Sequence, residues 1–133
     1  MIIGVDTNIL LRALLNEDPV QSPKARAFLS TLSEDSPGYV GATALAEIHW
    51  VLTKRYKIPK AEHISTLRLL LNLPALEFES FEATLRALDS YEKSNADFPD
   101  AFLAERNLDI GCLKTVTFDK RAAARIPGME LLS

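Results

Sequence analysis

The sequence has few cysteines, histidines and glycines, no excess of basic residues and no long apolar segment. A single cysteine, Cys112, excludes a disulfide within the chain, and with only two well-separated histidines it excludes a Cys/His zinc site. The longest apolar stretch, around residues 67–73, is interrupted by polar side chains and falls short of a membrane span. These absences favour a cytoplasmic protein, with no membrane association, that folds around an ordinary apolar core.

The size and composition are those of one globular domain. The chain has 133 residues, of which 47% are hydrophobic and 25% charged, so we expect a single domain over residues 1–133. The formal net charge is -3, whereas a generic nucleic-acid-binding domain has an excess of lysine and arginine. Any nucleic-acid site must therefore be local rather than spread over the whole surface.

Strand-like and helix-like segments alternate along the chain. Residues 2–5 form a continuously apolar, β-branched run typical of a strand buried on both faces, and Ser22 followed by proline predicts a helix start. Because parallel strands need helical crossovers, this alternation predicts an α/β fold, a three-layer α/β/α domain with a central parallel sheet of four to five strands. We expect strands at residues 2–5, 39–40, 76–81, 116–118 and 129–132, and helices that begin near residues 9, 23, 43, 59, 85 and 99.

Three acidic residues occupy positions that have both a structural and a functional interpretation. Asp6 and Asp119 follow predicted strands and precede predicted helices, where aspartate commonly caps the helix N-terminus. Asp100 lies in the first helical turn after Pro99, where the helix dipole favours an anion. The carboxyl ends of parallel strands are also where binding sites form in such sheets, so these acids are candidate site residues.

Glu47 is harder to explain structurally. It lies in the middle of a predicted helix, beside the apolar face that includes Leu45 and Ile48. We expect its carboxylate to be desolvated unless it pairs with a cation, and an ion pair with Lys54 or Arg55 is the structural alternative to a role in a site.

Taken together, the four acids predict a divalent-metal site. Carboxylates gathered in one pocket repel each other, and a bound cation relieves that repulsion. Hard oxygen ligands select Mg²⁺ or Mn²⁺, which can activate water for in-line hydrolysis of a phosphodiester.

Four sequence motifs in order resemble those of the PIN-domain ribonucleases, and within them the VapC-type toxins of toxin–antitoxin modules. The first is residues 3–10, IGVDTNIL, with Asp6, and the second is residues 44–47, ALAE, with Glu47. The third is residues 96–104, ADFPDAFLA, with Asp100, and the fourth is residues 116–119, VTFD, with Asp119. Each motif alone is weak, but their order and spacing cover essentially the whole chain.

The resemblance implies a site of named residues. Asp6, Glu47, Asp100 and Asp119 would be the metal-binding catalytic acids, with Mg²⁺ or Mn²⁺ as cofactor. The supporting polar residues would be Thr7, Asn8 and Thr117. Asp97, three residues before Asp100, is either a helix cap or a fifth acid at the rim of the site.

The same resemblance implies a metal-dependent endoribonuclease, the toxin of a type II pair, with RNA as substrate, a cognate antitoxin as partner and a homodimeric state. Two alternatives stay open: a PIN fold without catalytic activity that acts as a binding module, and a housekeeping nuclease without an antitoxin. Basic residues are candidate RNA contacts, none assigned individually, namely Arg12, Lys54, Arg55, Lys57, Lys60, Lys120, Arg121 and Arg125.

Other residues have structural interpretations. His49 and His63 lack a nearby nucleophile motif, so we expect surface or packing roles. Trp50 lies off the apolar face of its helix and is either partly exposed at a protein interface or packed. Leucines at positions 69, 71 and 73 widen the apolar surface of their helix, which a second copy or an antitoxin could cover.

Overall fold

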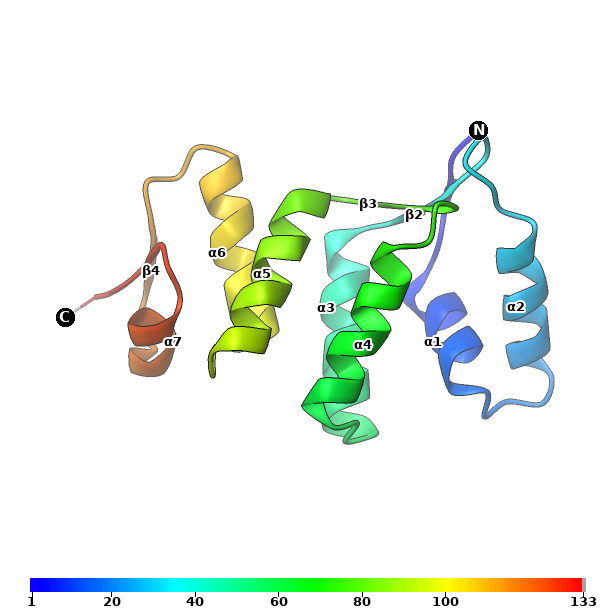
Figure 1. The fold of residues 1–133 in the computed structure, drawn as a ribbon, viewed down its shortest axis with the longest axis horizontal. Coiled ribbons are helices and arrows are strands. Elements are labelled where there is room, and N and C mark those ends of the chain that lie inside the picture. The colour runs from blue at the N-terminus through cyan, green and yellow to red at the C-terminus, as the bar shows by residue number, and fades with distance from the viewer. Residues whose placement is uncertain (133) are drawn as a thin grey trace. The chain divides into compact units, whose positions relative to one another are not determined.

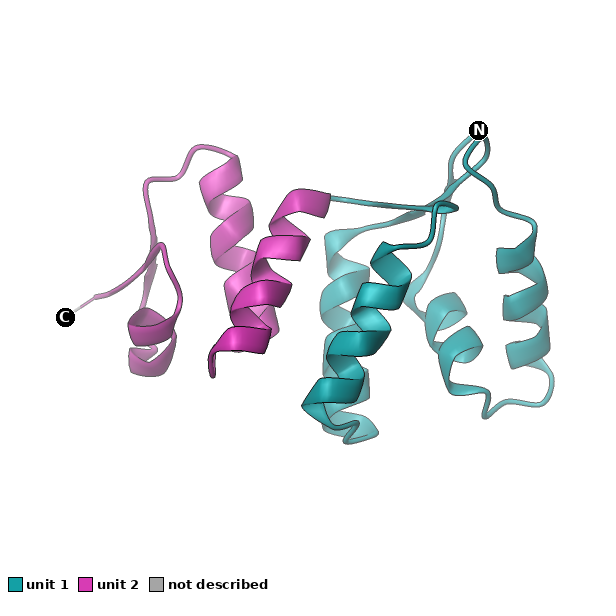
Figure 2. Ribbon diagram, viewed as in Figure 1, with its two compact units in different colours: residues 1–79 teal, residues 80–133 magenta. Residues whose placement is uncertain are grey.

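The computed structural model describes residues 1–132, which form two compact units (Figures 1 and 2). Unit 1, Met1–Glu79, contains β1 (Ile3–Gly4), α1 (Thr7–Leu15), α2 (Gln21–Ser30), β2 (Gly38–Val40), α3 (Ala42–Trp50), the π-helical segment η1 (Val51–Arg55), α4 (Lys60–Leu71) and β3 (Leu76–Phe78). Unit 2, from Ser80 onward, contains α5 (Phe81–Lys93), α6 (Phe98–Asp109), β4 (Thr115–Thr117), α7 (Lys120–Arg125) and β5 (Met129–Leu131). The single domain over residues 1–133 stays a prediction, and its last residue, Ser133, lies outside the described residues.

The sheet of unit 1 has three parallel strands in the order β1-β2-β3. The central strand β2 pairs Gly38 with Ile3 on one side and with Leu76 on the other. Val40, at the end of β2, is fully buried, and the helical crossovers supply Leu10, Leu45, Ile48 and Leu67 to the same core. The alternation of strands and helices therefore produces the parallel arrangement that the sequence predicts.

The first strand is shorter and more exposed than predicted. The sequence predicts a strand over residues 2–5 buried on both faces, but β1 spans only Ile3–Gly4, and Ile3 is 42% exposed. The reason is its position at the edge of the sheet, where it pairs with β2 alone. Only Val5, which follows the strand, is buried.

The second helix begins earlier than predicted. Ser22 does not cap α2; it lies inside the helix and is fully buried. Asp18 takes part in the start instead, because its Oδ1 accepts hydrogen bonds from the N–H groups of Val20 (2.9 Å) and Gln21 (2.8 Å). A side-chain-stabilised turn thus orders the backbone before the proline signal is reached.

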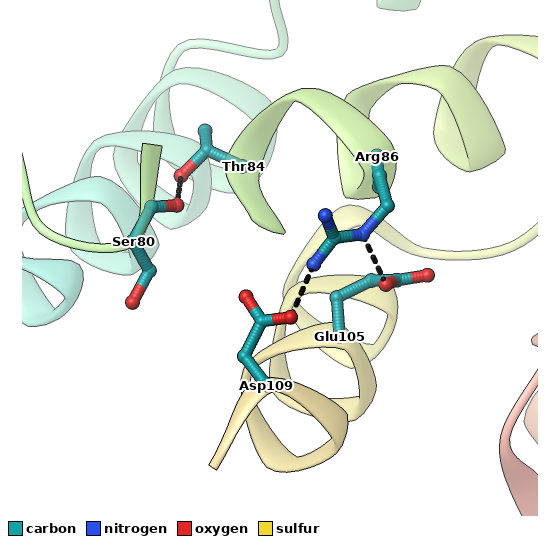
Figure 3. A network of polar contacts seen from close by, with 5 residues as sticks. All are labelled: Ser80, Thr84, Arg86, Glu105 and Asp109. Carbon is teal, nitrogen blue, oxygen red and sulfur yellow. Dashed lines mark hydrogen bonds and ion pairs between the residues drawn. The ribbon is translucent and has the colours of Figure 1, made fainter. Parts of the chain in front are cut away.

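Unit 2 is built on the neighbouring helices α5 and α6, which pack closely against each other. Ala83 and Ala87 of α5 are fully buried. Arg86 of α5 extends to α6, where its Nε donates to Glu105 (2.7 Å) and its Nη2 to Asp109 (2.6 Å), as Figure 3 shows. The same view shows Thr84 Oγ1 donating to the backbone oxygen of Ser80, at 2.9 Å, in the first turn of α5.

The remaining strands of unit 2, β4 and β5, form a second parallel sheet, with Thr115 opposite Met129 and Thr117 opposite Leu131. The predicted α/β class with parallel strands is confirmed, but the five strands divide into sheets of three and two rather than one sheet of four to five. No helix within residues 1–132 is long and apolar enough to cross a membrane.

Candidate active site

Asp6 and Asp119 occupy corresponding local positions, each directly before the first residue of a helix that follows a strand. Asp6 is the N-cap of α1, and its Oδ1 accepts from the N–H of Thr7 at 2.9 Å. Asp119 is the N-cap of α7, and its Oδ1 accepts from the N–H groups of Arg121 (2.9 Å) and Ala122 (3.0 Å). Both side chains are exposed. Since the caps use Oδ1 of each carboxylate, capping and metal binding through Oδ2 are compatible.

Asp100 has the most perturbed carboxylate of the predicted site. It lies in the first turn of α6 and is partly buried. Burial raises the pKa of Asp100 above its ordinary value of 3.8, and the negative charges of Asp97 and Asp119 raise that pKa further. Asp97 and Asp119 therefore each lie near enough to Asp100 for their charges to act on its carboxyl, and Asp97 contributes to the electrostatics of Asp100.

Asp97 has only part of the capping role considered for it. It occupies the N-cap position of α6, and its backbone oxygen accepts from the N–H of Ala101 at 3.0 Å. Its side chain, however, makes no capping hydrogen bond to the helix. The carboxylate is thus not used as a cap, which leaves the interpretation as a fifth acid open.

Glu47 is exposed, so the expected desolvation of its carboxylate is wrong. It lies on α3 beside buried Leu45 and Ile48, but its side chain extends to the surface, where it lines a hollow of about 380 Å³ together with Trp50. The alternative ion pair with Lys54 or Arg55 is absent within residues 1–132. An exposed carboxylate beside a hollow is accessible to a cation or a ligand.

The predicted supporting residues lie next to the acids that they were expected to serve. Thr7 is buried and donates its backbone N–H to Asp6. Thr117 Oγ1 accepts from the backbone N–H of Asp119 at 3.0 Å, which orders the turn between β4 and α7. Asn8 is exposed on α1 and lines two surface hollows.

The predicted acids are divided between the units: Asp6 and Glu47 belong to unit 1, and Asp100 and Asp119 belong to unit 2. Within unit 1, the helices that carry Asp6 and Glu47 at their start and middle, α1 and α3, contact each other. No three acidic, histidine or cysteine side chains of residues 1–132 are grouped closely enough to hold a metal ion. The donor chemistry nevertheless fits Mg²⁺ or Mn²⁺, because all candidates are carboxylates. The pKa of Asp100 is raised first by burial and then by the charges of Asp97 and Asp119, and a cation would offset these charges.

The basic residues considered as RNA contacts differ in their surroundings. Arg12 and Arg55 line hollows on unit 1, and so does Lys24, which no sequence pattern singled out. The sequence of α2 gives no signal for Lys24, since a single lysine on an amphipathic helix is ordinarily a solvated side chain. Its significance comes from the packing of α1 against α2, which places it near Arg12.

The residues with structural interpretations are placed as follows. His49 and His63 are buried, with ring centroids 4.7 Å apart in an edge-to-face arrangement, so their predicted packing role is confirmed. Trp50 is 59% exposed. Of the three leucines expected to widen an apolar surface, Leu69 and Leu73 are exposed but Leu71 is buried in the core.

Parallel strands joined by helices define an α/β protein, and carboxylates follow two of its strands. Residues 3–128 match the family model of the PIN domain, and the chain belongs to the PIN-domain family. PIN domains are generally nucleases, and they generally use divalent metals such as Mg²⁺. The resemblance identified from the four motifs is thereby confirmed.

No curated protein matches the chain significantly. Among solved structures, the chain is similar to a chain of VapBC2 from Rickettsia felis, in a crystal structure with a DNA fragment from the VapBC2 promoter. The sequence identity is 20%, the alignment covers 99% of this chain and 98% of that chain, and the TM-score is 0.45.

Proposed function

We propose that this protein is an endoribonuclease that depends on Mg²⁺ or Mn²⁺ and hydrolyses RNA phosphodiester bonds. The observation that carries the proposal is the placement of Asp6 and Asp119 after parallel strands, with Asp100 in the first turn of α6, in a chain of the PIN-domain family. The pKa of Asp100, which is raised by burial and further by the charges of Asp97 and Asp119, supports it. Ionised carboxylates held near each other repel, and a divalent ion is a ligand that relieves this repulsion.

In this proposal Asp6, Glu47, Asp100 and Asp119 hold the ion through their carboxylate oxygens, within one domain that spans residues 1–133. When bound, the ion supplies Lewis acidity that activates water and stabilises the departing oxygen. The chain's own contribution is to fix the oxygens. Thr117 and the first turn of α7 hold Asp119 in place, and the first turn of α1 holds Asp6.

The proposal includes a biological setting. The order of the four motifs resembles VapC-type toxins, so we propose a toxin of a type II pair, inhibited by a cognate antitoxin, cytoplasmic and homodimeric. A small protein that copurifies with the chain, or a short open reading frame beside its gene, would support the toxin over a housekeeping nuclease. Light scattering of the purified protein would test the homodimer.

The test of the chemistry is cleavage of a labelled RNA by the purified full chain, with Mg²⁺ or Mn²⁺ and with EDTA. We expect EDTA, Asp6→Asn and Asp100→Asn each to reduce the cleavage rate by at least roughly 100-fold. Glu82→Gln is the matched control, because Glu82 is an exposed acid in the first turn of α5 outside the proposed site. It should cleave at the wild-type rate.

Three outcomes would contradict parts of the proposal. Cleavage that survives both EDTA and the two substitutions would exclude the metal-dependent mechanism. Equal cleavage of a DNA strand of the same sequence would show a nuclease that is not specific for RNA. Folded wild-type protein that cleaves neither substrate under any metal condition would favour the alternative of a binding module without catalytic activity.

A further inference from the structure

Three hollows on the surface of unit 1 adjoin one another through shared residues. The first, of about 380 Å³, is lined by Glu47, Trp50 and Val51 among others. Val51 also lines the second, of about 90 Å³, where Arg55 and Tyr56 form part of the wall. The proposed catalytic residue Glu47 therefore lines a hollow that shares a wall residue, Val51, with the second hollow.

The series continues past the second hollow toward α2. Asn8 and Arg12 line both the second hollow and the third, which has a volume of about 480 Å³. Lys24 and Gln21 complete the polar part of the third hollow. Asn8 is two residues from Asp6, so a second proposed catalytic acid also lies near this path.

The charges along this path are cationic apart from Glu47. Arg12, Arg55 and Lys24 line the second and third hollows, and no acidic residue of the described chain lines either. Within residues 1–132 these three cations form no ion pair. Asp18 is near enough for the charge of Arg12 to lower its pKa, after the larger effect of hydrogen bonds from Gln21 and Val20, but it lines neither hollow.

The cationic side chains are partly preorganised. Arg12 Nε donates to Gln21 Oε1 at 2.8 Å, which fixes the guanidinium while most of its five donors stay available. The Arg55 guanidinium carbon lies 5.8 Å from the centre of the Tyr56 ring, a cation–π separation. Preorganised cations lose less side-chain entropy when they bind an anion.

We propose that Lys24, Arg12 and Arg55, with the rings of Tyr56 and Trp50, form a track that binds single-stranded RNA and leads its backbone toward Glu47. The inference rests on the proposed function, since it assigns the substrate-binding part of that site. The cations suit phosphates, and the aromatic rings suit unpaired bases, which stack on such side chains in single strands but not in duplexes. An acidic protein segment would use the charges but would gain little from the two rings.

The test is equilibrium binding of a fluorescein-labelled single-stranded RNA to the full chain, followed by anisotropy with EDTA present so that metal-dependent cleavage does not interfere. We expect Lys24→Gln, Arg12→Gln and Arg55→Gln each to weaken binding by about 3- to 10-fold. Each should also reduce the slope of log K against log salt by about 0.7, the value for one phosphate contact of a single strand.

Lys93→Gln is the matched control. Lys93 is an exposed lysine in the last turn of α5, outside the candidate RNA contacts, and it lines none of the three hollows. Its substitution should change binding by less than 2-fold. Arg12→Lys keeps the positive charge and loses the bond from Nε to Gln21, so it should keep the wild-type salt slope. Thermal unfolding of every variant identifies a loss of binding caused by misfolding.

Tyr56→Leu and Trp50→Leu test the aromatic part of the track. We expect each to weaken binding of the single strand by at least about 5-fold, and to leave binding of an RNA duplex unchanged. Equal affinity for single strand and duplex, with no effect of either substitution, would overturn base stacking. The proposed track of cations and rings would then be wrong, and only binding of phosphates by the cations would remain.

The remaining outcomes separate the track from the proposed reaction. Wild-type protein that does not bind RNA, or a Lys93→Gln loss as large as the others, overturns the track. If Asp100→Asn abolishes cleavage but substitutions of the track residues leave RNA binding unchanged, the reaction stands and the track fails. If substitutions of the track residues weaken RNA binding but the wild type cleaves no RNA, the track stands and the proposed reaction fails. An acidic peptide whose binding depends on the three cations, while RNA binding does not, would instead assign the surface to a protein partner.

Discussion

In unit 1, the charged side chains that line the second and third hollows are cations, whereas in unit 2 the negative charges of Asp97 and Asp119 each act on Asp100. Both arrangements gather charges of one sign. They call for opposite ligands, since the cations of unit 1 suit a polyanion and the acids of unit 2 suit a metal ion. In the proposed function, unit 1 supplies the cations that bind the RNA strand together with Asp6 and Glu47, and unit 2 supplies Asp100 and Asp119.

The units also differ in how their backbone is packed. Unit 1 is centred on a sheet in which Gly38 lies against neighbouring side chains, while unit 2 relies on the α5–α6 pair and on Arg86 between the helices. Stability and function can therefore be perturbed separately. Packing at Gly38 involves no charge, and the acids of unit 2 lie outside that packing.

Gly38→Ala should have the largest effect on stability. A Cβ at this position would lie 2.8 Å from both Leu32 Cδ1 and Val5 Cγ2, closer than real contacts allow. The leucine end can move, but the β-branched valine has little rotamer freedom, so β2 must shift. We expect the free energy of unfolding to fall by about 1–3 kcal/mol in urea denaturation.

Gly4→Ala is the control for that measurement, because a Cβ on Gly4 of β1 would meet nothing within 4 Å. It should change the free energy of unfolding by less than about 0.5 kcal/mol. An equal loss in both variants would mean that glycine is needed for backbone reasons and not for packing. RNA binding by the folded fraction of Gly38→Ala should stay at the wild-type level, since no charge changes.

Local features of the site could be predicted from the sequence. The positions of Asp6 and Asp119 after strands and before helices follow from short-range patterns, and both do cap their helices. The burial of β1 could not be predicted, because it depends on whether a second strand covers the other edge. The predicted cap at Ser22 is wrong because the turn formed by Asp18 starts α2 earlier.

Features that depend on packing between elements could not be predicted. The exposure of Glu47 depends on which neighbouring elements cover the side of α3 next to its apolar face. Nothing in the local sequence determines this. No sequence pattern distinguishes Lys24 and Tyr56 from other surface residues. They line hollows only because α1 lies against α2 and near η1. Periodicity reports which residues face a core, but not which surface side chains share a hollow.

Asp119→Ala should have the second-largest effect on stability, because it removes the carboxylate that caps α7. Two backbone N–H groups would lose their partner, and we expect a loss of about 1 kcal/mol in the free energy of unfolding. Asp119→Asn keeps an oxygen acceptor at the same place and should be close to wild type in stability. Thermal unfolding compares the two variants.

Cleavage assays on the same pair separate the two roles of Asp119. If its charge holds a metal ion, both variants should lose cleavage although only the alanine variant loses stability. Wild-type cleavage by Asp119→Asn would show instead that Asp119 is a structural cap alone. Such a result would leave Asp100 as the proposed metal-binding acid of unit 2.

Asp100→Asn should have the smallest effect on stability, and the opposite sign. Because the pKa of Asp100 is raised in the folded state, that state binds a proton more tightly than the unfolded chain does. The free energy of unfolding therefore falls as the pH rises from below 3.8 through the raised pKa, and the deficit is complete at neutral pH. Replacing the carboxyl by an amide removes this deficit, so we expect the melting temperature at pH 7 to rise by roughly 1–3 °C.

The pH dependence provides the internal control for Asp100→Asn. Below about pH 3.8 the carboxyl is protonated in both folded and unfolded chains, so the difference between variant and wild type should vanish there. Asp97→Asn, which removes one of the repelling charges, should give a smaller rise at pH 7. Addition of Mg²⁺ should stabilise the wild type more than Asp100→Asn, because the ion offsets a repulsion that the variant no longer has. A lower melting temperature for Asp100→Asn at pH 7 would contradict the view that the acids of unit 2 are held at a cost to stability.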